Sequence, residues 1–168
     1  MNRLYTNTLG IALALGFSLS AHALELEQAA PEFSLPQLSS GKMNSLSQYR
    51  GKVIYLDFWA SWCAPCRTSF PLLEKLYQAN KDKGFALVAI NMDEDLEAAN
   101  SFLKSYPATF DILRDAEGKW ADDYGVETMP TSFIIDKKGI VRHIHSGFAK
   151  DDIADIEKIV TKLLAESL

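Results

Sequence analysis

The stretch Val53-Ile-Tyr-Leu-Asp-Phe-Trp-Ala-Ser-Trp-Cys-Ala-Pro-Cys66 decides how the rest of the chain is interpreted. It begins with a nearly continuous apolar run, which is typical of a central strand buried on both faces. Cys63 and Cys66 follow and are the only cysteines in the chain. Because two residues separate them, one turn of helix can bring both sulfurs into bonding distance. The pair therefore indicates either redox chemistry or metal binding.

The composition is that of one soluble globular domain. The chain has 168 residues, of which 48% are apolar, enough for a single domain with its own core. The net charge is -5, and the longest basic run is Lys137-Lys138. Binding to a nucleic-acid backbone requires clustered Lys and Arg side chains. We therefore expect no nucleic-acid partner.

Residues 1–23 are expected to be a signal peptide, and residues 24–168 the folded domain. Arg3 supplies a positive charge, an apolar run spans 9–19, and Ala21-His22-Ala23 has the small-x-small pattern that a signal peptidase cleaves. The apolar run is much shorter than the roughly 20 residues that span a bilayer. The sequence thus predicts cleavage after Ala23 and export to the periplasm. The alternative is an uncleaved anchor at the outer face of the inner membrane.

The order of predicted elements is that of an α/β fold with a central sheet and helices on both faces. Residues 24–31 are expected to be a short exposed leader, followed by two strand-like stretches around 33–35 and 43–46. Hydrophobic periodicity and turn residues then predict strands at 53–59, 85–90, 110–113, 131–135 and 140–144. They predict a helix through 72–77 that ends at Gly84, and further helices at 96–103, 120–124 and 153–164.

The predicted helix after the apolar strand would place Cys63 at a helix N-terminus. Free backbone N–H groups and the helix dipole stabilise a thiolate there, and the thiolate is the nucleophile. Cys63 would attack a substrate disulfide, and Cys66 would then resolve the mixed disulfide. Pro65 suits the first turn of the helix. This cycle needs no bound cofactor and no metal.

Asp57 is the candidate proton acceptor for Cys66. It interrupts an apolar strand six residues before Cys63, and burial would raise its pKa, as a base for a buried thiol requires. An Asp that caps a turn or meets water at the end of the strand is the alternative interpretation.

Other interpretations of the cysteine pair remain open. A zinc site needs four ligands, and His143 and His145, which alternate along a predicted strand and so share one face, could add two to the cysteines. A metal- or haem-delivery chaperone would use the same residues. A cysteine peroxidase would need its reactive cysteine in a different local setting.

The run Trp59-Ala-Ser-Trp-Cys-Ala-Pro-Cys66 resembles a thioredoxin active site, and the wider chain resembles the exported TlpA/ResA/CcmG branch of the thioredoxin superfamily. The resemblance covers roughly residues 30–165. It continues through Asn91-Met-Asp93, Tyr124-Gly-Val126 and Met129-Pro-Thr131. It implies a thioredoxin fold with a central mixed β-sheet, an N-terminal β-hairpin extension and an insertion after the second core strand.

The same resemblance implies further site residues and partners. Pro130 corresponds to the family's cis-proline, which would expose the backbone of Met129 to an extended substrate segment. Trp62 and Pro65 would border the same substrate site, while Trp59 would lie in the core. The implied partners are protein disulfide substrates and a membrane electron-transfer thiol protein that recharges the pair. No dimer signal is visible, and we expect a monomer.

Two positions depart from the branch. Ser69 stands where many members carry Glu, and Asp57 occupies the place of the buried Asp of thioredoxin itself. Ala89 stands where thioredoxin has a lysine near that Asp. The resemblance implies reduction of disulfides in extracytoplasmic proteins, with cytochrome c maturation as a candidate role. A thiol oxidant is the main alternative direction.

Overall fold

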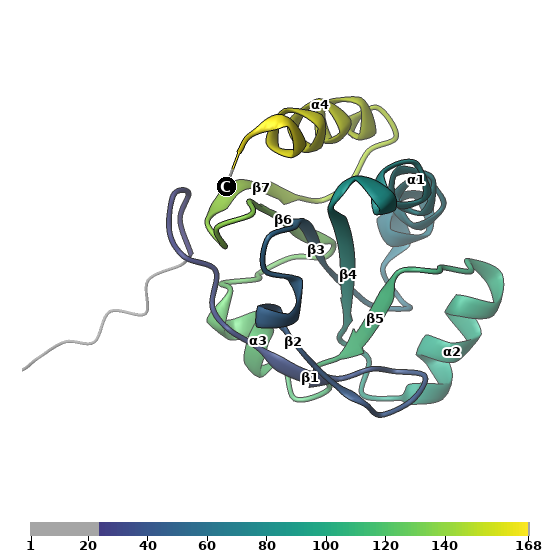
Figure 1. The fold of residues 1–168 in the computed structure, drawn as a ribbon. Helices are drawn as coiled ribbons and strands as arrows, with labels where there is room; N and C mark the ends of the chain where they lie inside the picture. Colours follow the sequence, from purple (N-terminus) through teal and green to yellow (C-terminus); the bar gives the residue numbers. More distant parts are fainter. Residues whose placement is uncertain (1–23, 168) are drawn as a thin grey trace, which may run out of the picture.

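A five-stranded mixed sheet forms the centre of the computed structural model, which describes residues 24–167 (Figure 1). Its strand order is β5-β4-β3-β6-β7, with β3, β4 and β5 parallel and β6 antiparallel to both of its neighbours. The strands are β3 Val53–Trp59, β4 Phe85–Asn91, β5 Asp111–Arg114, β6 Thr131–Ile135 and β7 Val141–Ser146. This is the expected thioredoxin fold.

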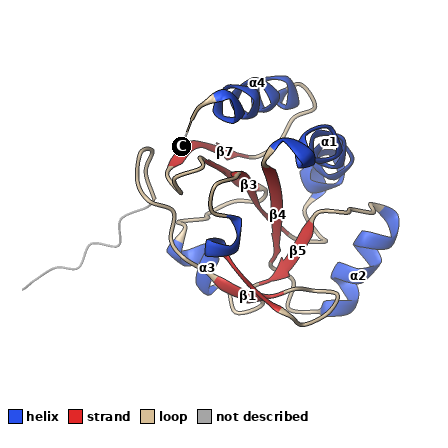
Figure 2. Cartoon of the chain, in the orientation of Figure 1, coloured by secondary structure: helices blue, strands red, loops and turns tan. Residues whose placement is uncertain are grey.

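Helices cover both faces of the sheet, as the continuous apolar runs of its central strands require (Figure 2). Every residue of β3 and β4 is buried. One face packs against α1 Ala64–Asn80, α2 Leu96–Ser105 and α4 Asp152–Ala165. The other face packs against α3 Lys119–Asp123 and the N-terminal segment. Short 3-10 helices lie at η1 Leu46–Tyr49 and η2 Lys81–Lys83.

Both of the expected additions to the core are present. The N-terminal hairpin consists of β1 Ser34–Pro36 and β2 Met43–Ser45, paired antiparallel. The segment predicted as an insertion after the second core strand contains α2 and then β5, which extends the sheet beside β4. Asp95 begins α2 by accepting a hydrogen bond from the N–H of Glu97 at 2.9 Å.

Residues 24–31, predicted as a short exposed leader, are bound to the sheet through their backbone. The side chains from Glu25 to Ala29 are exposed, as expected. The backbone, however, pairs with the start of β7: the N–H of Glu27 donates to the carbonyl of Val141 at 2.8 Å, and the N–H of Val141 donates to Gln28 at 2.8 Å. The side-chain pattern carried no sign of this pairing, because backbone groups make it.

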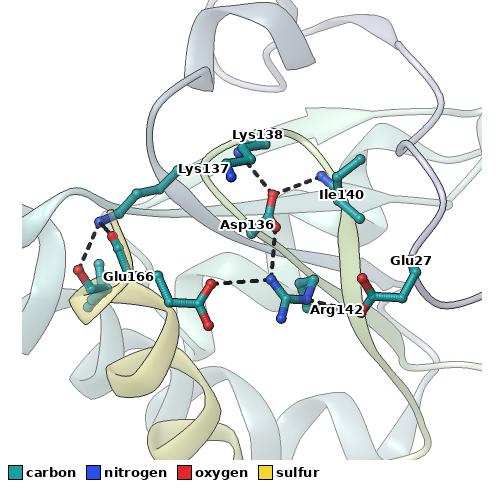
Figure 3. A network of polar contacts seen from close by, with 8 residues as sticks. Glu27, Asp136, Lys137, Lys138, Ile140, Arg142 and Glu166 are labelled. Atoms are coloured by element: carbon teal, nitrogen blue, oxygen red, sulfur yellow. Dashed lines mark hydrogen bonds and ion pairs between the residues drawn. The ribbon is translucent and has the colours of Figure 1, made fainter. Parts of the chain in front are cut away.

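Arg142 joins three separate parts of the chain in a polar network (Figure 3). Its guanidinium contacts Asp136 at 3.0 Å, Glu166 at 3.2 Å and Glu27 at 3.1 Å. Lys137 adds hydrogen bonds to the carbonyls of Leu164 and Glu166 at 2.8 and 2.6 Å. The network ties the N-terminal segment and the end of α4 to the β6–β7 hairpin.

Candidate active site

Cys63 and Cys66 form a disulfide at the N-terminus of α1. The Cα atoms are 5.3 Å apart. Cys63 is the N-cap residue, and the backbone N–H of Cys66 donates to its Sγ at 3.2 Å. A helix N-terminus favours negative charge. The geometry therefore suits a Cys63 thiolate once the disulfide is opened.

The residues around the disulfide lie where the sequence predicted. Pro65 is in the first turn of α1 and is exposed. Trp62 is 67% exposed. Trp59 is fully buried, with ring centroids 4.7 Å from those of both Phe70 and Phe102. Trp62 is thus available to a partner, whereas Trp59 belongs to the core.

The Met129–Pro130 peptide bond is cis and immediately precedes β6. Pro130 is buried, and the half-buried Met129 packs against the apolar cluster that contains both cysteines. Within residues 24–167 the backbone N–H and C=O of Met129 form no hydrogen bond. The carbonyl of Pro130 accepts one from Gly147 at 2.7 Å. The free backbone of Met129 is the kind of edge that an added strand can pair with.

Asp57 lies on the face of β3 that packs against α1. Residues alternate along a strand, so Asp57 shares its face with Tyr55 and Trp59, which belong to the cluster containing Cys66. Its side chain is 1% exposed, and its Oδ2 finds no hydrogen-bond partner among residues 24–167. Burial raises the pKa of Asp57 well above its usual value. The turn-capping alternative is inconsistent with this buried position.

Ala89 and Ser69, two positions at which the sequence departs from its relatives, are both buried. Ala89 pairs with Asp57 in the β3–β4 register and is fully buried, so no ammonium group reaches the carboxyl from this position. Ser69 is buried on α1, and its hydroxyl donates to the carbonyl of Cys66 at 3.2 Å. Because Ser69 stands in place of a Glu, Asp57 is the candidate carboxyl group for proton transfer at this site.

His143 and His145 share one face of β7, as their alternation predicted. Their rings are stacked, with centroids 6.1 Å apart, and His145 Nε2 lies 3.0 Å from Asp152 Oδ2. Burial, and then the neighbouring His145, lower the pKa of His143. In the part of the chain that the structure describes, no group of three or more His, Cys, Asp or Glu side chains could hold a metal ion. The alternative four-ligand zinc site is therefore not assembled among these residues.

One polar residue near the disulfide received no role in the sequence interpretation. Asp93 is 4% exposed and follows β4. Its carboxylate binds both the N–H and the hydroxyl of Ser61, two residues before Cys63. The sequence shows the Asn91-Met-Asp93 motif but does not pair it with a loop 32 residues away.

Thiol–disulfide exchange is the chemistry that this paired, helix-capping Cys63 can perform, and the surrounding fold places the chain among the thiol–disulfide oxidoreductases. Comparison with known proteins gives the same class. The chain belongs to the Redoxin family, which matches residues 25–162.

Individual relatives are similar along most of the chain. A thiol-disulfide oxidoreductase ResA of Bacillus thuringiensis subsp. konkukian is 33% identical over 153 residues, covering 90% of this chain and 88% of that protein. The thioredoxin-like protein YneN of Bacillus subtilis is 43% identical over 123 residues, 71% of each chain.

Solved structures of the same class superpose well. A Chlorobium tepidum protein described as a thiol:disulfide interchange protein DsbE gives a TM-score of 0.82 at 42% identity, covering 85% of this chain and all of that one. A secreted Mycobacterium tuberculosis disulfide oxidoreductase gives 0.67 at 25% identity, covering 76% of this chain and 95% of that one.

Proposed function

We propose that this protein is an exported dithiol reductant of protein disulfides. The observation that carries the proposal is the position of Cys63, which caps α1 and accepts the N–H of Cys66 at 3.2 Å. This arrangement favours a thiolate at Cys63. The thiolate attacks a substrate disulfide, forming a mixed disulfide and releasing one substrate thiolate.

Cys66 then resolves the intermediate. Its thiol loses a proton to the ionised form of Asp57, and the Cys66 thiolate attacks Sγ of Cys63, which forms the Cys63–Cys66 disulfide and releases the second substrate sulfur as a thiolate. Two electrons pass from the dithiol to the substrate. The buried carboxyl of Asp57, with its raised pKa, is suited to accept that proton. No bound cofactor takes part.

Substrate binding is assigned to the surface around the disulfide. The unpaired backbone of Met129, set by Pro130, would pair with an extended substrate segment. The exposed rings of Trp62 and Pro65 would provide apolar contact beside Cys63. Backbone pairing depends little on the side chains of the substrate segment, so the site is suited to several protein substrates.

Insulin reduction tests the activity. The purified protein should accelerate the reduction of insulin disulfides by dithiothreitol, and Cys63→Ser should have no effect above the uncatalysed rate. Full activity in Cys63→Ser would overturn the assignment. Equilibration with glutathione tests the direction: a potential nearer to about -270 mV than to about -120 mV supports a reductant. The opposite result would favour the thiol oxidant.

Export is a separate part of the proposal. The expected signal peptide, residues 1–23, lies outside the described residues. Among residues 24–167 no helix is long and apolar enough to cross a membrane. A relative described as secreted and the Arg3-led apolar segment support the proposal. N-terminal analysis of protein from a periplasmic fraction should begin at Leu24; a cytoplasmic chain that begins at Met1 would contradict it.

An exported reductant must be recharged, because its surroundings keep thiols oxidised. We propose that a membrane electron-transfer thiol protein reduces the Cys63–Cys66 disulfide, and that the present protein acts as a monomer. Cytochrome c maturation is the candidate pathway. Deleting such a partner should leave the Cys63–Cys66 pair oxidised in cells, as measured by thiol alkylation. A pair that stays reduced would exclude this source of electrons.

A further inference from the structure

The carboxylate of Asp93 holds the turn that leads into Cys63. Oδ2 accepts the N–H of Ser61 at 2.9 Å, and Oδ1 accepts the Ser61 hydroxyl at 2.8 Å. Asp93 is 4% exposed, so these bonds form where water competes little. A hydrogen bond to a charged acceptor is stronger than one between neutral groups.

Asn91 fixes the orientation of this carboxylate. Its Nδ2 donates to Asp93 Oδ2 at 2.7 Å, and the N–H of Asp93 donates back to Asn91 Oδ1 at 3.2 Å. Asn91 is fully buried as the last residue of β4, where it pairs with Trp59 in the parallel register. The Asp93 carboxylate is therefore attached to the rigid sheet and not to a mobile loop.

The turn that Asp93 holds determines where Cys63 lies. The N–H of Cys63 donates to the carbonyl of Ala60 at 3.1 Å, which closes a turn with Ser61 and Trp62 at its centre. In the oxidised protein the disulfide itself holds Cys63 near Cys66. In the dithiol and in the mixed disulfide that covalent restraint is absent, and Cys63 depends on this turn and on the start of α1.

We propose that Asp93 is a positioning residue for thiol–disulfide exchange: through Ser61 it keeps Cys63 within reach of Cys66 while their disulfide is open. This inference deepens the function proposed above and rests on it. The step it affects is the resolution reaction, in which Cys66 attacks Sγ of Cys63. Intramolecular reactions of this kind depend steeply on the placement of the reacting atoms.

A small disulfide probe separates the two steps without a protein substrate. Reduced protein is mixed with 5,5′-dithiobis(2-nitrobenzoate) in a stopped-flow instrument. In the first phase Cys63 attacks the probe, forms a mixed disulfide and releases one thionitrobenzoate. In the second phase Cys66 attacks Cys63, restores the disulfide and releases the second thionitrobenzoate. Two electrons leave the dithiol and reduce one probe molecule to two thiolates.

The proposal predicts a graded loss in the second phase. Asp93→Ala should slow it about tenfold or more, at a pH where both thiols are ionised. Ser61→Ala should slow it less, at most about fivefold, because the backbone N–H bond to Asp93 remains. The double variant should be no slower than Asp93→Ala alone, because both residues act through one turn.

Asp95→Asn is the matched control. It removes the exposed carboxylate of Asp95, which lies two residues after Asp93, caps α2 and does not contact the turn. It should leave both phases unchanged. A second phase of wild-type rate in folded Asp93→Ala would overturn the proposal, even if its melting temperature were lower. An effect limited to the pH midpoint of the first phase would also overturn it. Failure of the wild type with insulin would instead contradict the proposed function.

Discussion

The backbone N–H of Cys66 donates a hydrogen bond to Sγ of Cys63 at 3.2 Å, within the first turn of α1. This bond and the helix N-terminus favour negative charge on the same sulfur. The two cysteines are therefore unequal, although they are linked in one disulfide. We therefore propose that Cys63 is the sulfur that becomes the thiolate.

The thiolate of Cys63 should form at a lower pH than that of an ordinary free thiol. In Cys66→Ala, the rate of alkylation of Cys63 by iodoacetamide should reach half of its plateau well below about pH 8.5, the usual midpoint for a free thiol. Cys63→Ala provides the comparison, because its remaining Cys66 lies deeper in the helix and should alkylate slowly in the folded protein. Equal pH profiles for the two variants would contradict the assigned roles.

Replacing Asp57 should make the protein more stable and less active. Burial raises the pKa of Asp57 in the folded state. The folded protein therefore holds a proton that the unfolded chain releases, and stability falls as the pH rises above the unfolded value of about 3.9 until the folded pKa is passed. Asp57→Asn removes this loss, so its advantage in free energy of unfolding should grow from pH 5 to pH 8, by about 1–3 kcal/mol.

Urea unfolding of the disulfide-intact proteins measures that difference. Asp82→Asn, a change at an exposed carboxylate, should show no such trend. The resolution step of Asp57→Asn should slow by about a hundredfold, the usual contribution of a general base. A variant with an unchanged resolution rate would remove Asp57 from the mechanism.

Trp62→Ala should affect substrate binding without affecting the fold. The side chain is 67% exposed, so the free energy of unfolding should change by no more than about 0.5 kcal/mol. If Trp62 contacts the substrate, KM for insulin should rise while kcat changes little. Met43→Ala, another exposed apolar residue but on β2 of the hairpin, is the control. Identical KM values for the two variants would exclude Trp62 from the substrate site.

The Arg142 network should stabilise the protein in a pH-dependent way. Burial alone would raise the pKa of Asp136, but hydrogen bonds from Ile140, Arg142 and Lys138 lower it overall. Its contribution is therefore fully present above the unfolded value of about 3.9 and is lost as the pH falls through the folded pKa. Asp136→Asn should cost about 1–2 kcal/mol at pH 7 and progressively less below pH 4.

Thermal unfolding across this pH range measures the effect. Asp155→Asn breaks an exposed ion pair with Lys158 at 2.8 Å and should cost almost nothing, because exposed ion pairs contribute little. An equal cost for Asp136→Asn at pH 3 and pH 7 would show that charge is not the origin of its contribution.

Local patterns were sufficient to predict much of this structure. The apolar run 53–59 is buried on both faces, and His143 and His145 share one face because side chains alternate along a strand. The position of Pro65 in the first turn of α1 follows from its ring and missing N–H. These features depend on neighbours within a few residues, which a sequence shows directly.

Contacts between distant segments were not predictable in the same way. Arg142 reaches Glu27 across 115 positions, and Ser61 reaches Asp93 across 32. A charged or hydroxyl side chain has many possible partners, and only the fold selects among them. The backbone pairing of the N-terminal segment with β7 leaves no side-chain pattern at all.

Trapping the mixed disulfide tests the central claim most directly. Reduced Cys66→Ala is mixed with insulin, or with an extract of exported proteins, and the products are analysed by mass spectrometry without reducing agent. The account predicts covalent adducts through Cys63 in Cys66→Ala and none in Cys63→Ala. Adducts through Cys66 in Cys63→Ala, with none in the other variant, would contradict the assignment of Cys63 as the nucleophile.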